Sequence, residues 1–283
     1  MLEMRPSRPE DWPDCRALWK AAFGDDDAYI DNYYVNQYRP EQVLTLKEEG
    51  VLRSMLVLFP TQLRWPDGGL TRASYLYALA TDPAARGQGY ASFLLRYTDF
   101  YLGEQAVPFL TTVPAQPSLQ AFFAVSDFQP CHPIDEAELP MPVPGPEPAR
   151  PTAATAYREI REKLLEGTAH TVYDEAYLDY QKKVSALTGG GLYRMETSRG
   201  PACAVAELEG ELLDIRELLA PAGGQGEALA ALAAALPGKR CRVRCPAGRG
   251  ELPGTVRRSF GMGKRIPAAP KELGESYFGL AFD

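Results

Sequence analysis

The amino-acid sequence predicts an α/β protein with a mixed sheet, arranged as two tandem domains. Segments with the apolar pattern of strands are interspersed with segments whose apolar residues recur at helical spacing. Residues 139–152 carry prolines at alternate positions, which excludes a helix or a central strand and favours an extended linker. The predicted elements follow a similar order on both sides of this stretch. We therefore expect domains over residues 1–138 and 153–283.

The first domain is predicted to contain two helices, a hairpin, a strand–helix–strand unit and a short helix. The sequence Pro66-Asp67-Gly68-Gly69 marks a further hairpin turn. Apolar spacing predicts helices over 8–23, 27–38, 91–101 and 118–125, and strands over 42–47, 51–59, 75–81 and 108–113.

The second domain repeats this order without visible sequence similarity. Three consecutive glycines at 189–191 separate its first helices from the strands that follow. Apolar spacing predicts helices over 156–166, 174–186 and 225–236, and strands over 192–197, 201–208, 211–219, 240–245, 257–262 and 277–282.

Composition excludes several classes of protein. The formal net charge of −7 opposes nucleic acid as the main partner. No segment is apolar for long enough to span a membrane, and the N-terminus lacks the apolar core of a signal peptide. The five cysteines are scattered and only His132 and His170 accompany them, so no metal site is expected. Reduced thiols and a cytoplasmic location are the expectation.

The most informative stretch is 78–95, where an apolar strand leads through a glycine-bearing turn into an amphipathic helix. Such a junction gathers backbone N–H groups at a helix N-terminus, which favours a phosphate or pyrophosphate. A dinucleotide-binding G-x-G-x-x-G pattern and a P-loop Gly-Lys-Ser/Thr are both missing. The turn itself reads Arg86-Gly87-Gln88-Gly89-Tyr90-Ala91.

In this setting the turn resembles the Gln/Arg-x-x-Gly-x-Gly/Ala motif of the GNAT superfamily of acetyl-CoA-dependent N-acyltransferases. Asp82-Pro83 precedes it at the usual distance, and Gln116-Pro117 stands where the family often has Asn-Pro. The resemblance covers most of residues 3–130. It implies acetyl-CoA as acyl donor, with the pantetheine arm along a strand and the pyrophosphate on the turn. The residues implied are Leu79, Ala80, Thr81, Arg86, Gly87, Gln88, Gly89, Tyr90 and Ala91.

Within this family, the chain is most similar to the enhanced intracellular survival type, which joins a working GNAT domain to a degenerate one. The features that carry this resemblance are Trp19, Phe23-Gly24-Asp25-Asp26 and the strand 75–81. The second domain has glycines at 221–226 but no motif in frame, so we expect no coenzyme A there. That domain is expected to serve as a wall, a lid or a homo-oligomer surface. Those relatives continue into a third, sterol-carrier-like domain, which we do not expect here because the sequence ends at Asp283.

The catalytic acid and base stay open. Family members often use a tyrosine on the short helix as acid, but the matching residue here is Phe123. Candidate substitutes are Ser118, Tyr77 or a water, and a thiolate can also leave unaided because thiol pKa values lie near neutrality. The resemblance offers the terminal carboxylate of Asp283 as base; the alternative is an ordinary closing strand with a solvated Asp283.

The acceptor side is predicted around the acidic and aromatic run that starts the second helix. Carboxylates and aromatic faces suit a cationic amine. The alternatives are a solvated helix start for the aspartates and a core position for the tyrosines. The candidate residues are Asp25, Asp26, Tyr29 and Tyr33.

The sequence therefore predicts an N-acetyltransferase that acts on the primary amine of a small cationic molecule or peptide. One alternative is a non-catalytic acyl-CoA-binding regulatory protein, which Phe123 motivates. A second is a tandem-GNAT aminoacyl transferase that uses aminoacyl-tRNA, which the acidic charge opposes.

Overall fold

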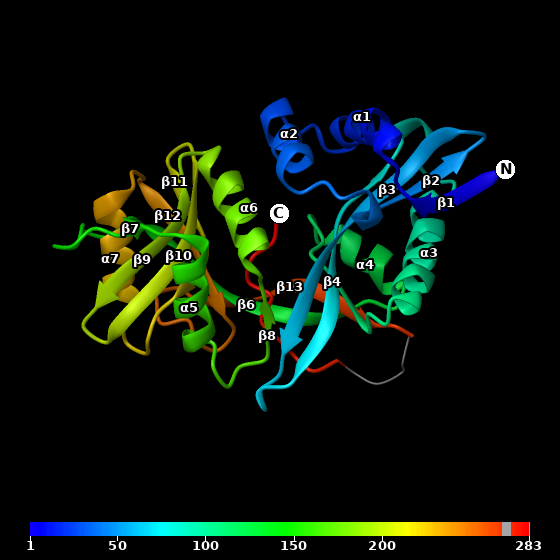
Figure 1. The fold of residues 1–283 in the computed structure, drawn as a ribbon. Coiled ribbons are helices and arrows are strands. Elements are labelled where there is room, and N and C mark those ends of the chain that lie inside the picture. The colour runs from blue at the N-terminus through cyan, green and yellow to red at the C-terminus, as the bar shows by residue number, and fades with distance from the viewer. Residues whose placement is uncertain (268–272, 283) are drawn as a thin grey trace.

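One mixed sheet joins both halves of the chain in the computed structural model, which describes residues 1–267 and 273–282 (Figure 1). Among the described residues it has 13 strands, in the order β1-β2-β3-β4-β5-β13-β6-β12-β11-β10-β9-β7, and β8 pairs with β3. The strands are β1 (Leu2–Pro6), β2 (Val43–Glu48), β3 (Val51–Arg64), β4 (Leu70–Thr81), β5 (Phe109–Thr112), β6 (Gln129–Pro140), β7 (Arg150–Pro151), β8 (His170–Val172), β9 (Gly191–Thr197), β10 (Gly200–Glu209), β11 (Leu212–Leu219), β12 (Arg240–Pro246) and β13 (Val256–Arg265).

The helices lie close to their predicted positions because their boundaries carry local signals. Gly24 ends α1 in a left-handed conformation, and the Asp26 and Asp174 side chains accept backbone N–H bonds at the starts of α2 and α6. The α-helices are α1 (Trp12–Phe23), α2 (Asp27–Asn36), α3 (Tyr90–Glu104), α4 (Ser118–Ala124), α5 (Ala154–Leu164), α6 (Glu175–Ala186) and α7 (Gln225–Ala235).

The predicted repetition of element order is present in the sheet. In the first half, β2, β3 and β4 are antiparallel neighbours, and β4 pairs in parallel with β5 after the crossover helix α3. In the second half, β9, β10 and β11 are antiparallel neighbours, and β11 pairs in parallel with β12 after α7. Strands β13 and β6 lie between these two units and connect them.

Strand β6 was not predicted, because it contains prolines that normally argue against a central strand. It pairs with β13 over residues 129–136 and with β12 over residues 134–140. Pro130 and Pro133 lie outside the β12 pairing, and Pro140 lies outside the β13 pairing. Each proline therefore sits where one edge of β6 has no strand beside it, and its missing N–H disrupts no ladder on that side.

The predicted extended linker, residues 139–152, is irregular only at 141–149. Leu139 and Pro140 end strand β6 and pair with β12, and Arg150–Pro151 form β7, so these ends of the predicted linker belong to the sheet. The irregular stretch 141–149 is also not a free spacer. The Met141 and Gly145 amides donate to the carbonyls of Lys239 and Ala230, and the Ala149 amide donates to the carbonyl of Ala231. The backbone of this stretch is thus held on the second half.

The prediction of a closing strand over 277–282 is wrong. Only Tyr277 forms a bridge, with His170, and the rest is irregular. The Phe278 and Leu280 carbonyls instead accept hydrogen bonds from the hydroxyls of Tyr173 and Tyr177. Side-chain donors thus replace a neighbouring strand, and Figure 1 places this segment between α6 and the first half.

An aromatic cluster packs the two halves together around this segment. The Phe282 ring lies 5.2 Å from Phe59 and 5.6 Å from Tyr77 of the first half, centroid to centroid. It also lies 5.0 Å from Tyr177 and 4.9 Å from Tyr180 of α6. Buried aromatic side chains of this size are major contributors to stability.

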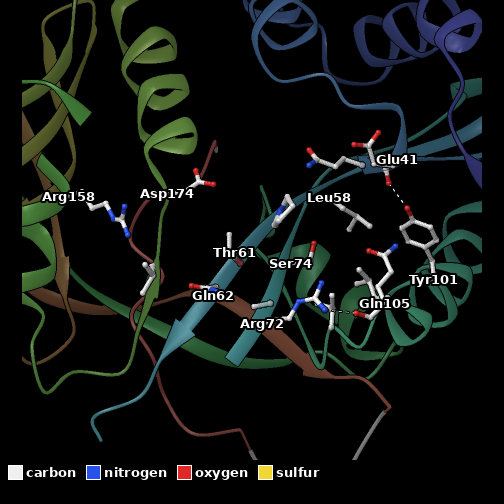
Figure 2. A pocket seen from close by; sticks show the side chains of 16 residues that line it. Glu41, Leu58, Thr61, Gln62, Arg72, Ser74, Tyr101, Gln105, Arg158 and Asp174 are labelled. Carbon is white, nitrogen blue, oxygen red and sulfur yellow. Dashed lines mark hydrogen bonds between the residues drawn. The ribbon is translucent and has the colours of Figure 1, made fainter. Parts of the chain in front are cut away.

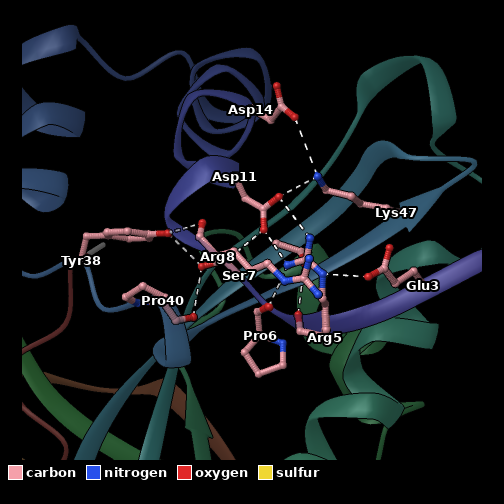
Figure 3. Close-up of polar contacts among 11 residues, drawn as sticks. Glu3, Arg5, Pro6, Ser7, Arg8, Asp11, Asp14, Tyr38, Pro40 and Lys47 are labelled. Carbon is pink, nitrogen blue, oxygen red and sulfur yellow. Dashed lines mark hydrogen bonds and ion pairs between the residues drawn. The ribbon is translucent and has the colours of Figure 1, made fainter.

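A buried carboxylate fixes the start of the first half (Figure 3). Asp11, only 2% exposed, accepts from Arg5 Nη1 at 2.6 Å, from Lys47 Nζ at 2.7 Å and from the Arg8 amide at 2.7 Å. Burial alone would raise the pKa of Asp11, but these donors outweigh it and hold the pKa well below its usual range. The carboxylate therefore ties β1 and β2 to the start of α1.

Candidate active site

A bulge in β4 shapes the centre of the site. Tyr77 lies opposite Val57 and Ala80 lies opposite Met55, so two residues of β4, Ala78 and Leu79, face one residue of β3. Ala78 adopts φ +49°, which is unusual for a residue with a side chain. A bulge takes the extra residue out of the ladder and leaves its backbone groups free for another partner.

The sheet opens next to this bulge. Strands β4 and β5 pair only at Ser74, Tyr75 and Leu76, and β5 ends at Thr112 while β4 continues to Thr81. The edge of residues 77–81 on the β5 side therefore has no described strand beside it. An unpaired edge of this kind can bind an extended molecule that carries amide groups.

The turn after β4 has the geometry of an anion site. Gly87 and Gly89 adopt φ +81° and +82°, and Gly89 begins α3 with no side chain capping it. The first N–H groups of α3 have no partner inside the helix, and the helix dipole adds positive potential. Arg86 is exposed beside them and forms no ion pair with any other described residue.

Two adjoining cavities follow β4. One, of about 500 Å³, runs along residues 79–81 and the turn, and its lining includes eight of the nine residues predicted to bind coenzyme A. The ninth, Gln88, does not line it and accepts a hydrogen bond from the Tyr90 hydroxyl at 3.2 Å. The second cavity, of about 380 Å³, lies beside residues 75–79. The residues common to both linings are Phe23, Leu79, Leu119 and Phe123.

The candidate acids are placed very differently. Tyr77 lines the second cavity, its hydroxyl lies 2.7 Å from the hydroxyl of Tyr29, and burial raises the pKa of both phenols. Phe123 contributes an apolar wall to both cavities and packs on Phe128. Ser118 is exposed at the start of α4 and lines neither cavity. Asp283 lies outside the described residues.

Of the four residues predicted on the acceptor side, two line the second cavity and two do not. Asp25 and Tyr29 line the second cavity. Asp26 is exposed and caps α2 through the Tyr29 amide at 2.7 Å. Tyr33 is fully buried and packs on Trp19. The structure therefore places Asp26 at a helix start and Tyr33 in the core, which are the two alternative roles.

Sequence reasoning missed Phe282 as a wall of the second cavity. The signal that could have found it was the family resemblance, which brings the adjacent Asp283 to the site of the first domain, whereas the apolar pattern of 277–282 indicated a closing strand. Phe23 gave a weak signal through its place beside Gly24 and Asp25.

The corresponding turn in the second half is filled by the chain itself. The Glu251 carboxylate accepts from the Gly223 amide at 2.7 Å and the Gln225 amide at 3.4 Å, at the start of α7. The Gln225 side chain donates to the Arg249 carbonyl and accepts from the Glu251 amide. An internal carboxylate thus takes the place that an anion would need.

A third cavity, of about 420 Å³, lies away from these residues between β3–β4 and the second half (Figure 2). Arg72 donates to the Gln105 carbonyl and Tyr101 donates to the Glu41 carbonyl on one side of it. Arg158 and Asp174 line the opposite side. None of the predicted site residues lines it.

Two kinds of feature are absent from residues 1–267 and 273–282. No group of three or more His, Cys, Asp or Glu side chains is arranged to hold a metal ion. No helix there combines the length and apolar character needed to cross a membrane.

Comparison with known proteins agrees with this geometry. Residues 3–122 match the family model of the acetyltransferase (GNAT) domain. A probable N-acyltransferase from Enterococcus faecalis V583 has 13% identity and a TM-score of 0.74, with 94% of this chain and 73% of that chain covered. A GCN5-related N-acetyltransferase from Anabaena variabilis has 15% identity and a TM-score of 0.72, with the same coverage. Eis1 from Mycobacterium abscessus has 10% identity and a TM-score of 0.63, covering 94% and 74%.

These identities show a shared fold, and no curated protein matches the sequence. A bulged strand beside an opened sheet and a glycine turn before a crossover helix are features of residues 3–122, and these residues match an acetyltransferase (GNAT) domain. The solved structures extend the shared fold to 94% of the chain.

Proposed function

We propose that this enzyme transfers the acetyl group of acetyl-CoA to a primary amine, by direct attack of the amine on the thioester. The observation that carries this proposal is the pair of adjoining cavities along β4, which meet at the bulge of Ala78 and Leu79. The larger cavity is lined by the strand edge and the glycine turn that would bind acetyl-CoA, and the smaller cavity offers space for the amine.

The donor fits the larger cavity by charge and by hydrogen bonding. Pyrophosphate would accept from the free N–H groups of α3, where Gly87 and Gly89 present no side chain, and Arg86 would add a positive charge. The amides of the pantetheine arm would pair with the free edge of Leu79–Thr81. Because Glu251 fills the other turn, we propose one coenzyme A site per chain.

The acetyl transfer then needs a neutral amine, a hydrogen-bond donor for the oxyanion and an acid for the thiolate. The neutral amine nitrogen forms a bond to the thioester carbon, and an N–H at the β4 bulge would stabilise the oxyanion that results. The nitrogen loses a proton to water, the carbon–sulfur bond breaks, and coenzyme A leaves as its thiolate. Of the phenols that line the smaller cavity, we assign Tyr77 the role of giving this thiolate a proton, which would be replenished from solvent.

Substitution of the cap glycine tests the donor site. Gly89→Glu would put a carboxylate where the pyrophosphate binds, and we expect coenzyme A affinity to fall by about 100-fold in isothermal titration. Gly89→Ala controls for strain at positive φ, since an added Cβ would meet only Phe93, at 3.6 Å.

Gly223→Glu is the matched control in the second half, where φ is +79° and an added Cβ also has room. It should leave coenzyme A affinity unchanged. Unchanged affinity in a folded Gly89→Glu protein would refute the assignment of the turn. Coenzyme A binding without turnover of any amine would refute acetyl transfer.

A further inference from the structure

We infer that the acceptor is an amine with a single positive charge on an aromatic or aliphatic body, rather than a polyamine or a polycationic sugar. This inference rests on the proposed acetyl transfer and concerns the smaller cavity beside residues 75–79. It names the kind of amine that this cavity selects.

Among the described residues, the lining of the smaller cavity carries one charged side chain. Asp25 is the one Asp, Glu, Lys, Arg or His among the described lining residues, and the lining also includes the phenols of Tyr29, Tyr75 and Tyr77. The rest of the wall is mainly apolar or aromatic, and includes Trp19, Phe23, Val113, Pro114, Leu119, Phe123 and Phe282. Such a wall favours an apolar body on the ligand.

One oxygen of the Asp25 carboxylate is held by a hydrogen bond, and the other has no described hydrogen-bond partner. The Trp19 indole N–H donates to Asp25 Oδ2 at 2.8 Å, while Oδ1 accepts from no described residue. Trp19 is fully buried, so it fixes the position of the carboxylate. Phe23, 45% exposed, lies in the same lining and can present an aromatic face to a bound ammonium group.

The neighbouring acids are engaged elsewhere. Asp26 caps α2 through the Tyr29 amide. Asp27 is paired with Arg16 and Lys20, and Asp31 is paired with Arg16. The acidic run therefore supplies the cavity with one carboxylate, and a second ammonium group would enter an apolar wall without a partner, which is strongly unfavourable.

The charge also fits the reaction. Asp25 would bind the ammonium form, one proton would leave to water, and the neutral nitrogen would then attack the thioester. This role makes Asp25 a substrate-binding residue whose loss weakens amine binding more than the chemical step.

Steady-state rates of coenzyme A release with 2-phenylethylamine, hexylamine, spermidine and an aminoglycoside test the inference. We expect kcat/KM for the two monoamines to exceed that for spermidine by about 100-fold. Asp25→Asn should raise KM for 2-phenylethylamine by about 100-fold, with a smaller change in kcat and unchanged coenzyme A affinity. Asp26→Asn is the matched control, because asparagine still caps the helix and the residue lies outside the cavity.

Three results would overturn the inference. These are a preference for spermidine or the aminoglycoside, an unchanged amine KM in Asp25→Asn, or an equal effect of Asp26→Asn. The proposed function fails separately, and this inference with it, if no amine is acetylated by a protein that binds acetyl-CoA.

Discussion

At the scale of single residues, the proton donor that we propose lies on a strand and not on the short helix α4. The resemblance implies a tyrosine at the position of Phe123, and the phenol of Tyr77, on β4, lines the smaller cavity together with Phe123. Burial raises the pKa of Tyr77 well above its usual value, so the phenol keeps its proton throughout the neutral range.

This arrangement makes Tyr77→Phe the informative variant. If Tyr77 protonates the leaving thiolate, kcat should fall by about 100-fold while coenzyme A affinity stays the same. Because the raised pKa keeps the phenol protonated, kcat of the wild-type enzyme should not decline as the pH rises to about 10. Stopped-flow or steady-state assays of coenzyme A release across this pH range measure both quantities.

Tyr29→Phe serves as control, since it removes the hydroxyl that contacts Tyr77 and leaves the Tyr77 phenol in place. Its effect on kcat should be smaller. A change in kcat of less than about 2-fold in Tyr77→Phe, far below the usual size of an acid–base effect, would mean that water protonates the thiolate or that it leaves unaided.

The residues around 25–29 show how far the site could be predicted from the sequence. Residue types around 25–29 indicated an acceptor site, but the choice of Asp25 over Asp26 depended on which side chain caps the helix and which meets Trp19. Those contacts involve neighbours six and three residues apart, and the sequence is compatible with either choice.

At the scale of elements, the two crossover helices differ at their N-termini. Helix α3 begins without a side-chain cap and leaves its amides free, whereas α7 begins against Glu251. The two halves therefore share their strand order but differ at these helix N-termini, and this difference decides which turn can bind an anion.

Glu251→Ala should destabilise the protein by about 1 kcal/mol, as the loss of a helix cap does. Differential scanning calorimetry should show a midpoint lower by about 2–4 °C. Inorganic phosphate should recover part of this loss in the variant and not in the wild type, because it can bind the amides that Glu251 releases. Coenzyme A affinity should not change.

Glu211→Ala is a suitable control, since Glu211 is exposed and pairs only with the exposed Lys239. Equal stabilisation by phosphate in the Glu211 and Glu251 variants would show that the ion acts elsewhere, and would contradict the interpretation of the α7 turn.

Most of the long elements were predictable because periodicity and caps are local, and two of the exceptions share one cause. Strand β6 has prolines that a sheet tolerates only because β12 and β13 each cover part of its length. Residues 277–282 are apolar like a strand, yet tyrosine hydroxyls from another helix and loop satisfy their carbonyls. Both features depend on partners distant in sequence.

At the scale of the whole molecule, the two halves share more than a linker. Strand β13 comes from the end of the second half but pairs with β5 at Phe109–Thr112 of the first half. It lies between β5 and β6, so the sheet of the first half is incomplete without it. Phe282 then closes the acceptor cavity from the same end of the chain. The predicted boundaries at 138 and 153 therefore stay a prediction about sequence organisation, while the fold points to mutual dependence.

We expect a fragment of residues 1–138 to lack cooperative unfolding and to show no thermal shift with coenzyme A. Without β13 and residues 273–282, the edge of β5 and the aromatic cluster around Phe59 would lie open to solvent, and exposure of that apolar surface would remove much of the stability.

A full-length protein cut once by a protease within the loop 141–149 is the matched control. It retains every strand and should still bind coenzyme A, because pairing of β13 with β5 and β6 does not need an intact loop. Tight binding by the isolated fragment would show that the donor site forms without the second half, and would contradict the dependence of that site on β13.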